Sequence, residues 1–339
     1  MKSFFNFKNQ FAKERISFGL DIGTQTTKLV KLRFAKDIVE LCGFEFEPTQ
    51  ETTQEVLKKI RQSTGADSLN LSVSGQATVI RYVNFTNMNK EELHKALKFE
   101  AQKHIPFSVE EVNLDACILK DNLPDNKMLI LLAAVKKELV NQRIKMMEEA
   151  SMRVNLIDID SLALVNAFDF NYLAEEQKAA KTVALLNIGA SMSNLDIVDD
   201  GSPRLSRDIH IAGNNFTQKL ADIFAKDFKS AEEMKINPQA DEANKVAAAV
   251  ESVLANLAGE IRTSFDYYES QNASSVGKIF LSGGGSKFTN LKDMLSNLLG
   301  IEVEYWDPLK NITIAEGLDQ EKIKAYSGQL AVAVGVALR

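Results

Sequence analysis

The chain has 339 residues, of which 45% are hydrophobic and 25% are charged. Its length favours about two domains, and its composition excludes an intrinsically disordered chain, a collagen-like chain and a small disulfide scaffold. The formal net charge of −6 argues against nucleic-acid binding as a main role. Cys42 and Cys117 lack metal-type spacing, which favours a reduced, intracellular compartment. Apolar runs stay far below the ~20 residues that a membrane-spanning helix needs.

The first segment, residues 1–15, combines phenylalanines with lysines and lacks the apolar core of a signal peptide. One interpretation is an amphipathic contact with an anionic membrane surface. The other is a leader whose phenylalanines pack on the domain or on a partner, and the sequence favours this second interpretation.

Two similar segments, residues 16–32 and 183–198, each predict a β-hairpin. Each has an apolar run, a turn of glycine and small hydroxyl residues, and a second alternating strand. Aligning Asp21 with Asn187 also superposes Gly23 on Gly189, at an offset of 166 positions, close to half the chain. The offset predicts two related halves.

Between these hairpins, residues 78–85 alternate like a strand. Asn89 and Glu92 have the spacing of a capping box, which predicts a helix up to His104 that ends before Pro106. Two further strands are predicted at 112–119 and 128–135, and a helix at 136–150.

The second half is predicted to contain a helix after Gly213, a polar stretch over 229–242 and a long helix over 244–270. A short strand over 278–282 then runs into three consecutive glycines, and an amphipathic helix follows that is capped by Gly300. Glycines between a strand and a helix let the backbone come close to an anion. The loop lacks the endings of a P-loop and the spacing of a Rossmann motif.

Together the turns predict a phosphate clamp with donors on two sides. Asp21 is the expected anchor for Mg²⁺, through water, although it could instead cap its own turn. Lys28 is expected to return to the phosphates as a point charge. The other predicted nucleotide-binding residues in these turns are Gly23, Thr24, Gln25, Thr26, Gly189, Ala190, Ser191, Gly283, Gly284 and Gly285.

Three stretches carry a resemblance to a known superfamily. DIGTQTTK at 21–28, NIGASMSN at 187–194 and FLSGGGSKF at 280–288 resemble the phosphate-one, phosphate-two and adenosine segments of the actin-like ATPases. Within that superfamily the chain resembles the PilM family of type IV pilus assembly, which is related to FtsA. FEAQKHIPFSVEEVNLDACIL, AAVKKELVNQRIKMMEEASM and the closing AVAVGVALR extend this resemblance over nearly the whole chain.

The resemblance implies an α/β, actin-like (ribonuclease H-like) fold of two duplicated lobes with an inserted strand–helix–strand–strand subdomain. The expected boundaries are 1–15 for the leader, 16–77 and 153–180 for the first lobe, 78–152 for the inserted subdomain and 181–339 for the second lobe. A helical and polar insertion is expected at about 212–275. The resemblance also implies bound ATP or ADP with Mg²⁺, Gly213 at the nucleotide, and Glu260 and Thr263 toward the adenosine.

One departure from the family's pattern bears on hydrolysis. The second phosphate segment of the family begins with an aspartate, and this chain has Asn187. An amide can still accept from metal-bound water, but it lacks the charge that holds Mg²⁺. We therefore expect slow or absent hydrolysis, with nucleotide acting as a structural clamp. No general base is assigned; Asp158 and Asp160 are candidates, and Asp160 is equally suited to begin a helix.

The resemblance implies a cytoplasmic scaffold, peripheral at the inner membrane, for the type IV pilus platform. Its expected partner is the N-terminal cytoplasmic peptide of the inner-membrane protein PilN, in a groove between the first lobe and the inserted subdomain. Pilus motor ATPases are further candidate partners. The alternatives are an FtsA-like division protein, an actin-fold small-molecule kinase, and the cytoplasmic half of a type II secretion protein.

Overall fold

The computed structural model describes residues 14–36, 38–49, 53–176, 182–239 and 241–339. The expectations for the leader at 1–15 therefore lie almost wholly outside the described residues. Within these ranges, helices that could span a bilayer are absent. The described strands form three separate sheets.

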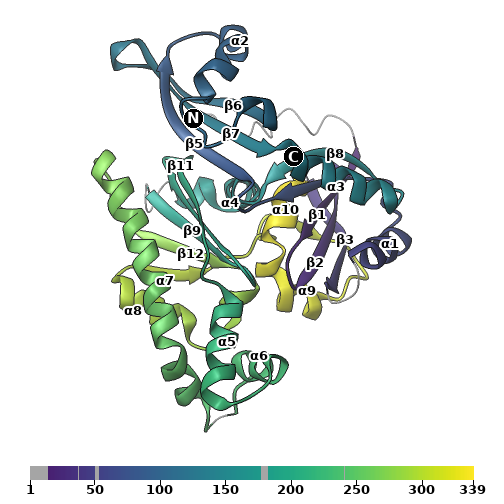
Figure 1. The fold of residues 1–339 in the computed structure, drawn as a ribbon. Coiled ribbons are helices and arrows are strands. Elements are labelled where there is room, and N and C mark those ends of the chain that lie inside the picture. The colour runs from purple at the N-terminus through teal and green to yellow at the C-terminus, as the bar shows by residue number, and fades with distance from the viewer. Residues whose placement is uncertain (1–13, 37, 50–52, 177–181, 240) are drawn as a thin grey trace.

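The first sheet has the strand order β14-β3-β2-β1-β4-β8 (Figure 1). β1 and β2 form the first predicted hairpin, β3 continues antiparallel, and β4 runs parallel to β1. Leu29 is buried with helix α1 on one face, and Val30 is buried with α10 on the other, because successive strand residues face opposite sides. The bounds are β1 (Arg15–Ile22), β2 (Thr26–Ala35), β3 (Ile38–Pro48), α1 (Thr53–Thr64), β4 (Ser68–Val73), β8 (Arg153–Ile159), β14 (Thr313–Ile314) and α10 (Ala331–Ala337).

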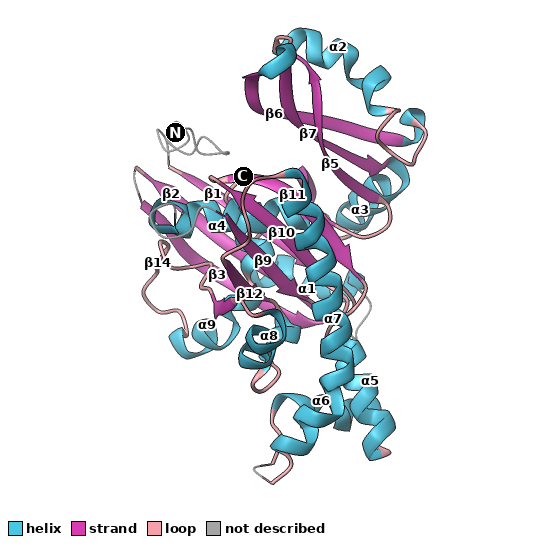
Figure 2. Ribbon diagram, turned by 90° about the vertical axis from the view of Figure 1, so that its left-hand side faces the viewer, coloured by secondary structure: helices cyan, strands magenta, loops and turns pink. Residues whose placement is uncertain are grey.

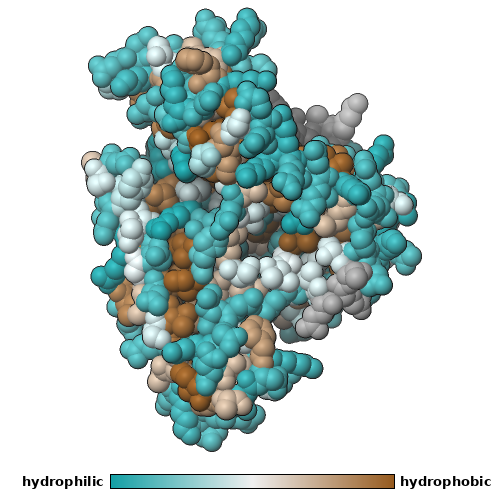
Figure 3. Space-filling view, viewed as in Figure 1, coloured by the Kyte–Doolittle hydropathy of each residue, from teal (hydrophilic) through white to brown (hydrophobic). Residues whose placement is uncertain are grey.

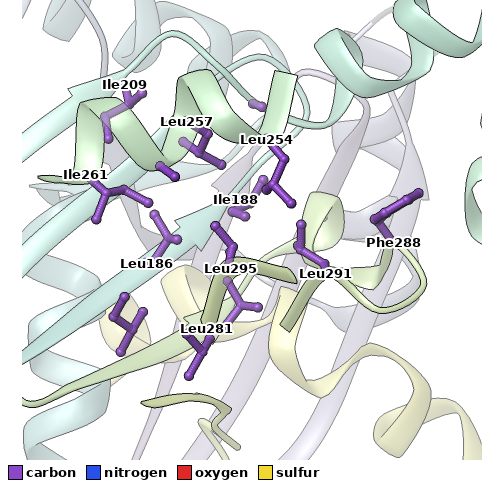
Figure 4. Close-up of a cluster of buried hydrophobic side chains, with 14 of the residues drawn as sticks. Leu186, Ile188, Ile209, Leu254, Leu257, Ile261, Leu281, Phe288, Leu291 and Leu295 are labelled. Carbon is purple, nitrogen blue, oxygen red and sulfur yellow. The ribbon is translucent and has the colours of Figure 1, made fainter. Parts of the chain in front are cut away.

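The second sheet has the order β11-β10-β9-β12-β13 and repeats this plan. β9 and β10 form the second predicted hairpin, and β12 runs parallel to β9. Its outer face is covered by the long helix α7 and by α8, whose apolar residues meet those of the strands in Figure 4. The bounds are β9 (Thr182–Ile188), β10 (Ser193–Asp199), β11 (Ser202–Ile209), α7 (Ala243–Gln271), β12 (Lys278–Ser282), α8 (Leu291–Leu299) and β13 (Glu302–Tyr305). Gly300 adopts φ 70° after α8, as its predicted capping role requires.

Helices α4 (Asp160–Glu176) and α10 lie between these two sheets and share one core. α10 packs on β1, β2 and β4 of the first sheet, and α4 packs on β9 and β10 of the second. A Cβ on Gly335 would overlap the Ala163 backbone, and one on Gly19 would overlap Ala333, so these close approaches require glycine. α4 contacts β9, β10 and β11 of the second sheet and also β4 and β8 of the first, while α10 and β14, expected within 181–339 of the second lobe, belong with the first sheet.

The third sheet has the order β5-β7-β6 and stands apart from the other two in Figure 2. Its elements follow in the order strand, helix, strand, strand, and Asn89 and Glu92 form the predicted capping box of α2. Helix α3 lies within the range 78–152 expected for the subdomain, but it packs on the first lobe, where Met147 is buried with residues of α1 and β4. The bounds are β5 (Thr78–Thr86), α2 (Lys90–Ala101), β6 (Val112–Leu123), β7 (Lys127–Lys136) and α3 (Lys137–Glu149). We call β5, α2, β6 and β7 the inserted subdomain.

The chain between β11 and α7 extends from the second lobe as α5 (Gly213–Phe224) and α6 (Phe228–Ile236). The predicted polar stretch therefore contains a helix, α6, whose buried residues include Met234. Figure 3 shows apolar surface at this end of the molecule. Ile223 of α5 and Phe228 of α6 are exposed. The remaining elements are α9 (Gln320–Tyr326) and short 3₁₀ turns at Val109–Glu111, Pro124–Asn126, Gly284–Lys287 and Ser327–Gln329.

Candidate functional site

The two predicted hairpins have the same register. Asp21 lies opposite Lys28 in β1–β2, and Asn187 lies opposite Asn194 in β9–β10, so the alignment of the hairpins is confirmed. The chemistry of the two pairs differs. Asp21 Oδ2 and Lys28 Nζ form an ion pair at 2.8 Å, whereas Asn187 Nδ2 donates to Asn194 Oδ1 at 3.1 Å.

The turns of the two hairpins also match. The Gly23 amide donates to the Thr26 carbonyl at 3.1 Å, and the Gly189 amide donates to the Met192 carbonyl at 3.0 Å. A Cβ on Gly23 would lie 2.8 Å from its carbonyl partner, and one on Gly189 would lie 2.6 Å from its own. Real Cβ atoms do not approach this closely, so both turns require glycine.

The two turns meet between the lobes. Thr24 Oγ1 and Ser191 Oγ lie 2.7 Å apart, although 167 residues separate them. Gln25 Nε2 donates to Asn214 Oδ1 at 2.8 Å, and the Asn214 amide donates to the Ala190 carbonyl at 2.7 Å. The structure therefore brings the predicted phosphate-binding groups of both halves together with the first turn of α5.

The predicted glycine-rich loop lies directly against the second hairpin. A Cβ on Gly283, which has φ 90°, would lie 2.7 Å from Asn187 Oδ1, and one on Gly285 would lie 2.6 Å from the Gly189 carbonyl oxygen. The Gly213 amide donates to the same Gly189 carbonyl at 3.0 Å, and a Cβ on Gly213 would lie 3.4 Å from the Gly285 Cα. Glycines from three separate segments thus form one surface without side chains.

The other end of this loop faces the C-terminal part of the chain. A Cβ on Gly284 would lie 3.0 Å from Gln329 Oε1. Burial lowers the pKa of Lys287, whose Nζ lies 4.6 Å from the centroid of the Tyr326 ring. Lys287 was within a predicted segment but was not singled out, because a lysine after a glycine run has no distinctive sequence signal.

The two candidate bases have different surroundings. Asp158 is buried and pairs with Arg339 at 2.9 Å, so its carboxylate already has a protein partner. Asp160 begins α4, and burial, followed by the negative charge of Asp21, raises its pKa to about 6. Of the two candidate bases, Asp158 therefore has an ion-pair partner, and Asp160 is the one whose pKa responds to the charge of the first hairpin.

A buried lysine beside Gly213 escaped the sequence analysis. Lys235 Nζ donates to Glu232 Oε2 at 2.6 Å, to Thr217 Oγ1 at 2.9 Å and to the Gly213 carbonyl at 3.3 Å. Its side chain is 3% exposed, and burial lowers its pKa despite the neighbouring carboxylate. The sequence places Lys235 in a polar stretch, and the fold alone carries it to the glycines.

Glu260 and Thr263 are not brought to this surface. Glu260 forms an ion pair with Arg207 of β11, and the Thr263 hydroxyl donates to the Gly259 carbonyl at 2.9 Å. In the strand register, Arg207 lies opposite Leu195, whose side chain faces α7 on the outer side of the sheet. The Glu260–Arg207 ion pair is therefore on the outer side, whereas the neighbouring Asn194 faces the opposite side. Figure 4 shows Ile261 on the Leu186 side of the cluster, away from the Ile188 end that leads into the turn.

A nucleotide-bound Mg²⁺ fits this donor set better than a metal held by protein alone. Among the described residues, no group of three or more His, Cys, Asp or Glu side chains could enclose a metal ion. Mg²⁺ commonly binds one or two carboxylates and takes its other ligands from phosphates and water. Asp21 can supply such a carboxylate. Both amide atoms of Asn187 have protein partners, in Asn194 and in Ser282.

The chain is similar to known proteins both in sequence and in fold. A family model described as type IV pilus assembly protein PilM matches residues 19–339. A solved structure described as a PilM–PilN type IV pilus biogenesis complex is 25% identical, with a TM-score of 0.83, and the match covers 95% of this chain and 98% of that chain.

More distant structures share the fold alone. The ethanolamine utilization protein EutJ from Carboxydothermus hydrogenoformans is 12% identical, with a TM-score of 0.53, over 97% of this chain and 91% of that chain. MreB5 of Spiroplasma citri bound to ADP is 11% identical, with a TM-score of 0.50, over 95% of this chain and 94% of that chain. The predicted actin-like α/β fold is confirmed, and the family match decides against a division protein, a small-molecule kinase and a secretion protein.

Proposed function

The chain belongs to the PilM family of type IV pilus assembly proteins, and we propose that it is a nucleotide-binding scaffold of the pilus assembly platform. Its partner is a PilN-type inner-membrane protein, bound through the N-terminal cytoplasmic peptide, so that the chain is peripheral at the cytoplasmic face. A PilM–PilN complex is the described state of the similar solved structure. Pilus motor ATPases are further candidate partners.

The nucleotide phosphates are proposed to lie where the two hairpin turns meet. The observation that carries this proposal is the 2.7 Å approach of the Thr24 and Ser191 hydroxyls from opposite lobes, with the Lys28 ammonium close to Gly23 of the first turn. Hydroxyls, main-chain amides and a lysine are the donors that phosphate oxygens prefer. The adenosine of the bound ATP or ADP is proposed to extend toward Gly213 and Lys235.

We propose that the nucleotide acts mainly as a clamp between the lobes. Mg²⁺ would neutralise phosphate charge, held through water by Asp21, while Asn187 offers no second charge to hold it. Asp160 is the proposed acceptor for a proton from an attacking water, at a slow rate or not at all. Nucleotide at ~1000 times its dissociation constant would favour the closed form by about 4 kcal/mol, without any chemistry.

The partner peptide is proposed to bind next to β8, between the first lobe and the inserted subdomain. β8 ends the strand order of the first sheet within the described residues, so its outer edge can pair with an extended peptide. A cavity of about 450 Å³ adjoins β8 on the side of the first lobe, with Asn70, Asn155, Leu156 and Arg339 among its lining residues and, within the described part of the chain, none from the inserted subdomain. Amide and apolar groups together suit an extended peptide with alternating side chains.

The nucleotide proposal is tested on purified, denatured protein by anion-exchange analysis of released nucleotide. We expect adenine nucleotide near one equivalent. Its absence, together with no binding of added Mg·ATP, would contradict the proposal. Phosphate release at tens per minute that Asp21→Ala abolishes would instead contradict the clamp.

The partner proposal is tested by titrating a fluorescent peptide that carries the N-terminal sequence of the PilN-type protein. We expect Leu156→Asp to weaken binding at least about tenfold, because it removes apolar contact and adds a charge at the cavity. Ile223→Asp, an equivalent change at the exposed end of α5, is the matched control. Equal affinity of both variants would contradict the assigned groove.

A further inference from the structure

A chain of hydrogen bonds leads from the glycine-rich segment to the other lobe. The Ser282 hydroxyl donates to Asn187 Oδ1 at 3.3 Å, and Asn187 Nδ2 donates to Asn194 Oδ1 at 3.1 Å. Asn194 Nδ2 then donates to Asp208 Oδ1 at 2.9 Å, and the Gly75 amide donates to Asp208 Oδ2 at 3.1 Å. The chain therefore joins the second hairpin to the connection between β4 and β5.

The direction of these bonds explains why residue 187 is an amide. Asn194 has a single carbonyl oxygen, which accepts from Asn187, and a single NH₂ group, which donates to Asp208. An aspartate at 187 would leave Asn194 facing two carboxylates with one donor group. A carboxylate oxygen at 187 would then face the Asn194 side-chain oxygen without a hydrogen between them. Because Asn194 is only 3% exposed, water offers little compensation.

The far end of the chain is the start of the inserted subdomain. Gly75 has φ 90°, and its carbonyl accepts from the Thr78 amide at 2.9 Å and from the Thr78 hydroxyl at 2.8 Å. Thr78 is the first residue of β5. A displacement of Asp208 is thus transmitted through one tight turn to the edge of that sheet.

A second contact joins β11 directly to β5. Tyr82 of β5 and Ser206 of β11 lie with their hydroxyl oxygens 2.9 Å apart. Asp196 pairs with Ser206 in register and is fully buried, and burial raises the pKa values of both Asp196 and Tyr82. Burial therefore disfavours the charged forms of both groups, and the Tyr82–Ser206 contact is a hydrogen bond between two hydroxyls beside the charge-assisted one from Gly75.

We infer that Asn187, Asn194 and Asp208 are positioning residues that couple the nucleotide site to the inserted subdomain. This inference rests on the proposed nucleotide binding. A nucleotide that orders the second hairpin orders the turn at Gly75 through this chain, and so fixes the angle of the subdomain that borders the partner groove. By thermodynamic reciprocity, a ligand that fixes the subdomain favours nucleotide to the same degree.

The experiment measures hydrogen exchange of peptides covering residues 75–86 in the full chain, with and without Mg·ADP or Mg·ATP. In the wild type, nucleotide should slow this exchange. Asp208→Asn keeps the shape of the side chain but can satisfy only one of its two donors. It should speed exchange at Gly75 about tenfold without nucleotide, as loss of a charge-assisted hydrogen bond predicts, and abolish the slowing by nucleotide.

Two matched controls separate the chain from general effects on the second lobe. Asp199→Asn makes the same substitution on β10, where it keeps the acceptor for Thr182 and removes the long ion pair with Arg204, at 3.9 Å. Tyr268→Phe removes a tyrosine hydroxyl that bonds Ser274, and Tyr82→Phe removes the one at the strand contact. Asp199→Asn and Tyr268→Phe should keep the nucleotide response, whereas Tyr82→Phe should reduce it. Tyr82→Phe also serves if Asp208→Asn fails to fold.

The outcomes distinguish this inference from the proposed function. A wild type that binds nucleotide without slowed exchange at 75–86 overturns the coupling and leaves nucleotide binding intact. A normal response in Asp208→Asn also overturns it. A wild type that binds no nucleotide contradicts the proposed function, and the coupling fails with it.

Discussion

The two hairpins that meet between the lobes share a backbone and differ in chemistry. Asp21 and Lys28 form an ion pair in the first, and the residues 166 positions later, Asn187 and Asn194, form an amide pair in the second. Register, turn and glycine positions are the same, because the backbone imposes them. The side chains were free to diverge, so that one turn keeps the charges suited to a metal and phosphate and the other points its amides at neighbouring protein groups.

The largest expected effect comes from replacing one residue of the Asp21–Lys28 pair with the asparagine found in the second hairpin, and then replacing the other. Asp21→Asn should lower the unfolding free energy by about 3–5 kcal/mol, because the Lys28 ammonium, 12% exposed, would lose its anion. Adding Lys28→Asn should recover more than half of that loss, although nucleotide affinity stays low. Urea denaturation measures both variants. Equal instability of the single and double variants would mean that the ion pair is not what distinguishes the lobes.

The charge of the first pair also reaches Asp160. The folded-state pKa of about 6 lies above the ordinary value of 3.8, so the folded protein binds more protons than the unfolded one between these pH values. This contribution to stability is present below about pH 4 and is lost as the pH rises to about 6. Asp160→Asn should therefore be more stable than the wild type at pH 7, by at most about 3 kcal/mol.

Urea unfolding of both proteins from pH 4 to pH 7 gives this difference directly. The Asp160 charge is also a minor cause of the raised pKa of Asp196, so Asp160→Asn relieves both carboxyl groups and the measured difference includes this coupling. A difference that stays constant across the pH range would contradict the assignment to Asp160.

The shared turn predicts equal effects in the two lobes. Gly23→Ala and Gly189→Ala should each cost about 2 kcal/mol, because the new Cβ would lie under 3 Å from a backbone carbonyl oxygen. Gly259→Ala, on α7 with open space around it, should instead add up to about 1 kcal/mol. Chemical denaturation ranks all three. A harmless Gly189→Ala beside a damaging Gly23→Ala would break the equivalence of the hairpins.

The smallest expected effect comes from restoring the acid in the second hairpin. Asn187→Asp should cost about 1–2 kcal/mol, because two oxygens would face each other at Asn194. Asn187→Asp with Asn194→Lys, which transplants the first pair, should remain less stable than the wild type, since Asp208 would lose its amide donor. If the transplanted pair proved as stable as the wild type, the amides would have no structural role beyond filling the position.

The sequence by itself determined the hairpins, the glycine-rich loop, the capped helix α2 and the apolar stripe of α7. Each of these features depends on residues that are close in the chain. The hairpins follow from alternating strand residues and glycines in the turns, and α2 begins at the capping box between Asn89 and Glu92. The predicted groups Thr24, Gln25 and Ser191 came together because the duplication fixed the turns that carry them.

Tertiary structure alone decided the position of α4 and α10 between the two sheets, the place of Lys235 beside Gly213, and the link from Asp208 to Gly75. It also placed Glu260 on the outer face, where its helical spacing had given no direction. These contacts join residues that are far apart in sequence, and their partners depend on how whole layers pack. Local pattern fixes which face of an element is apolar, but the packing of the layers fixes what that face meets.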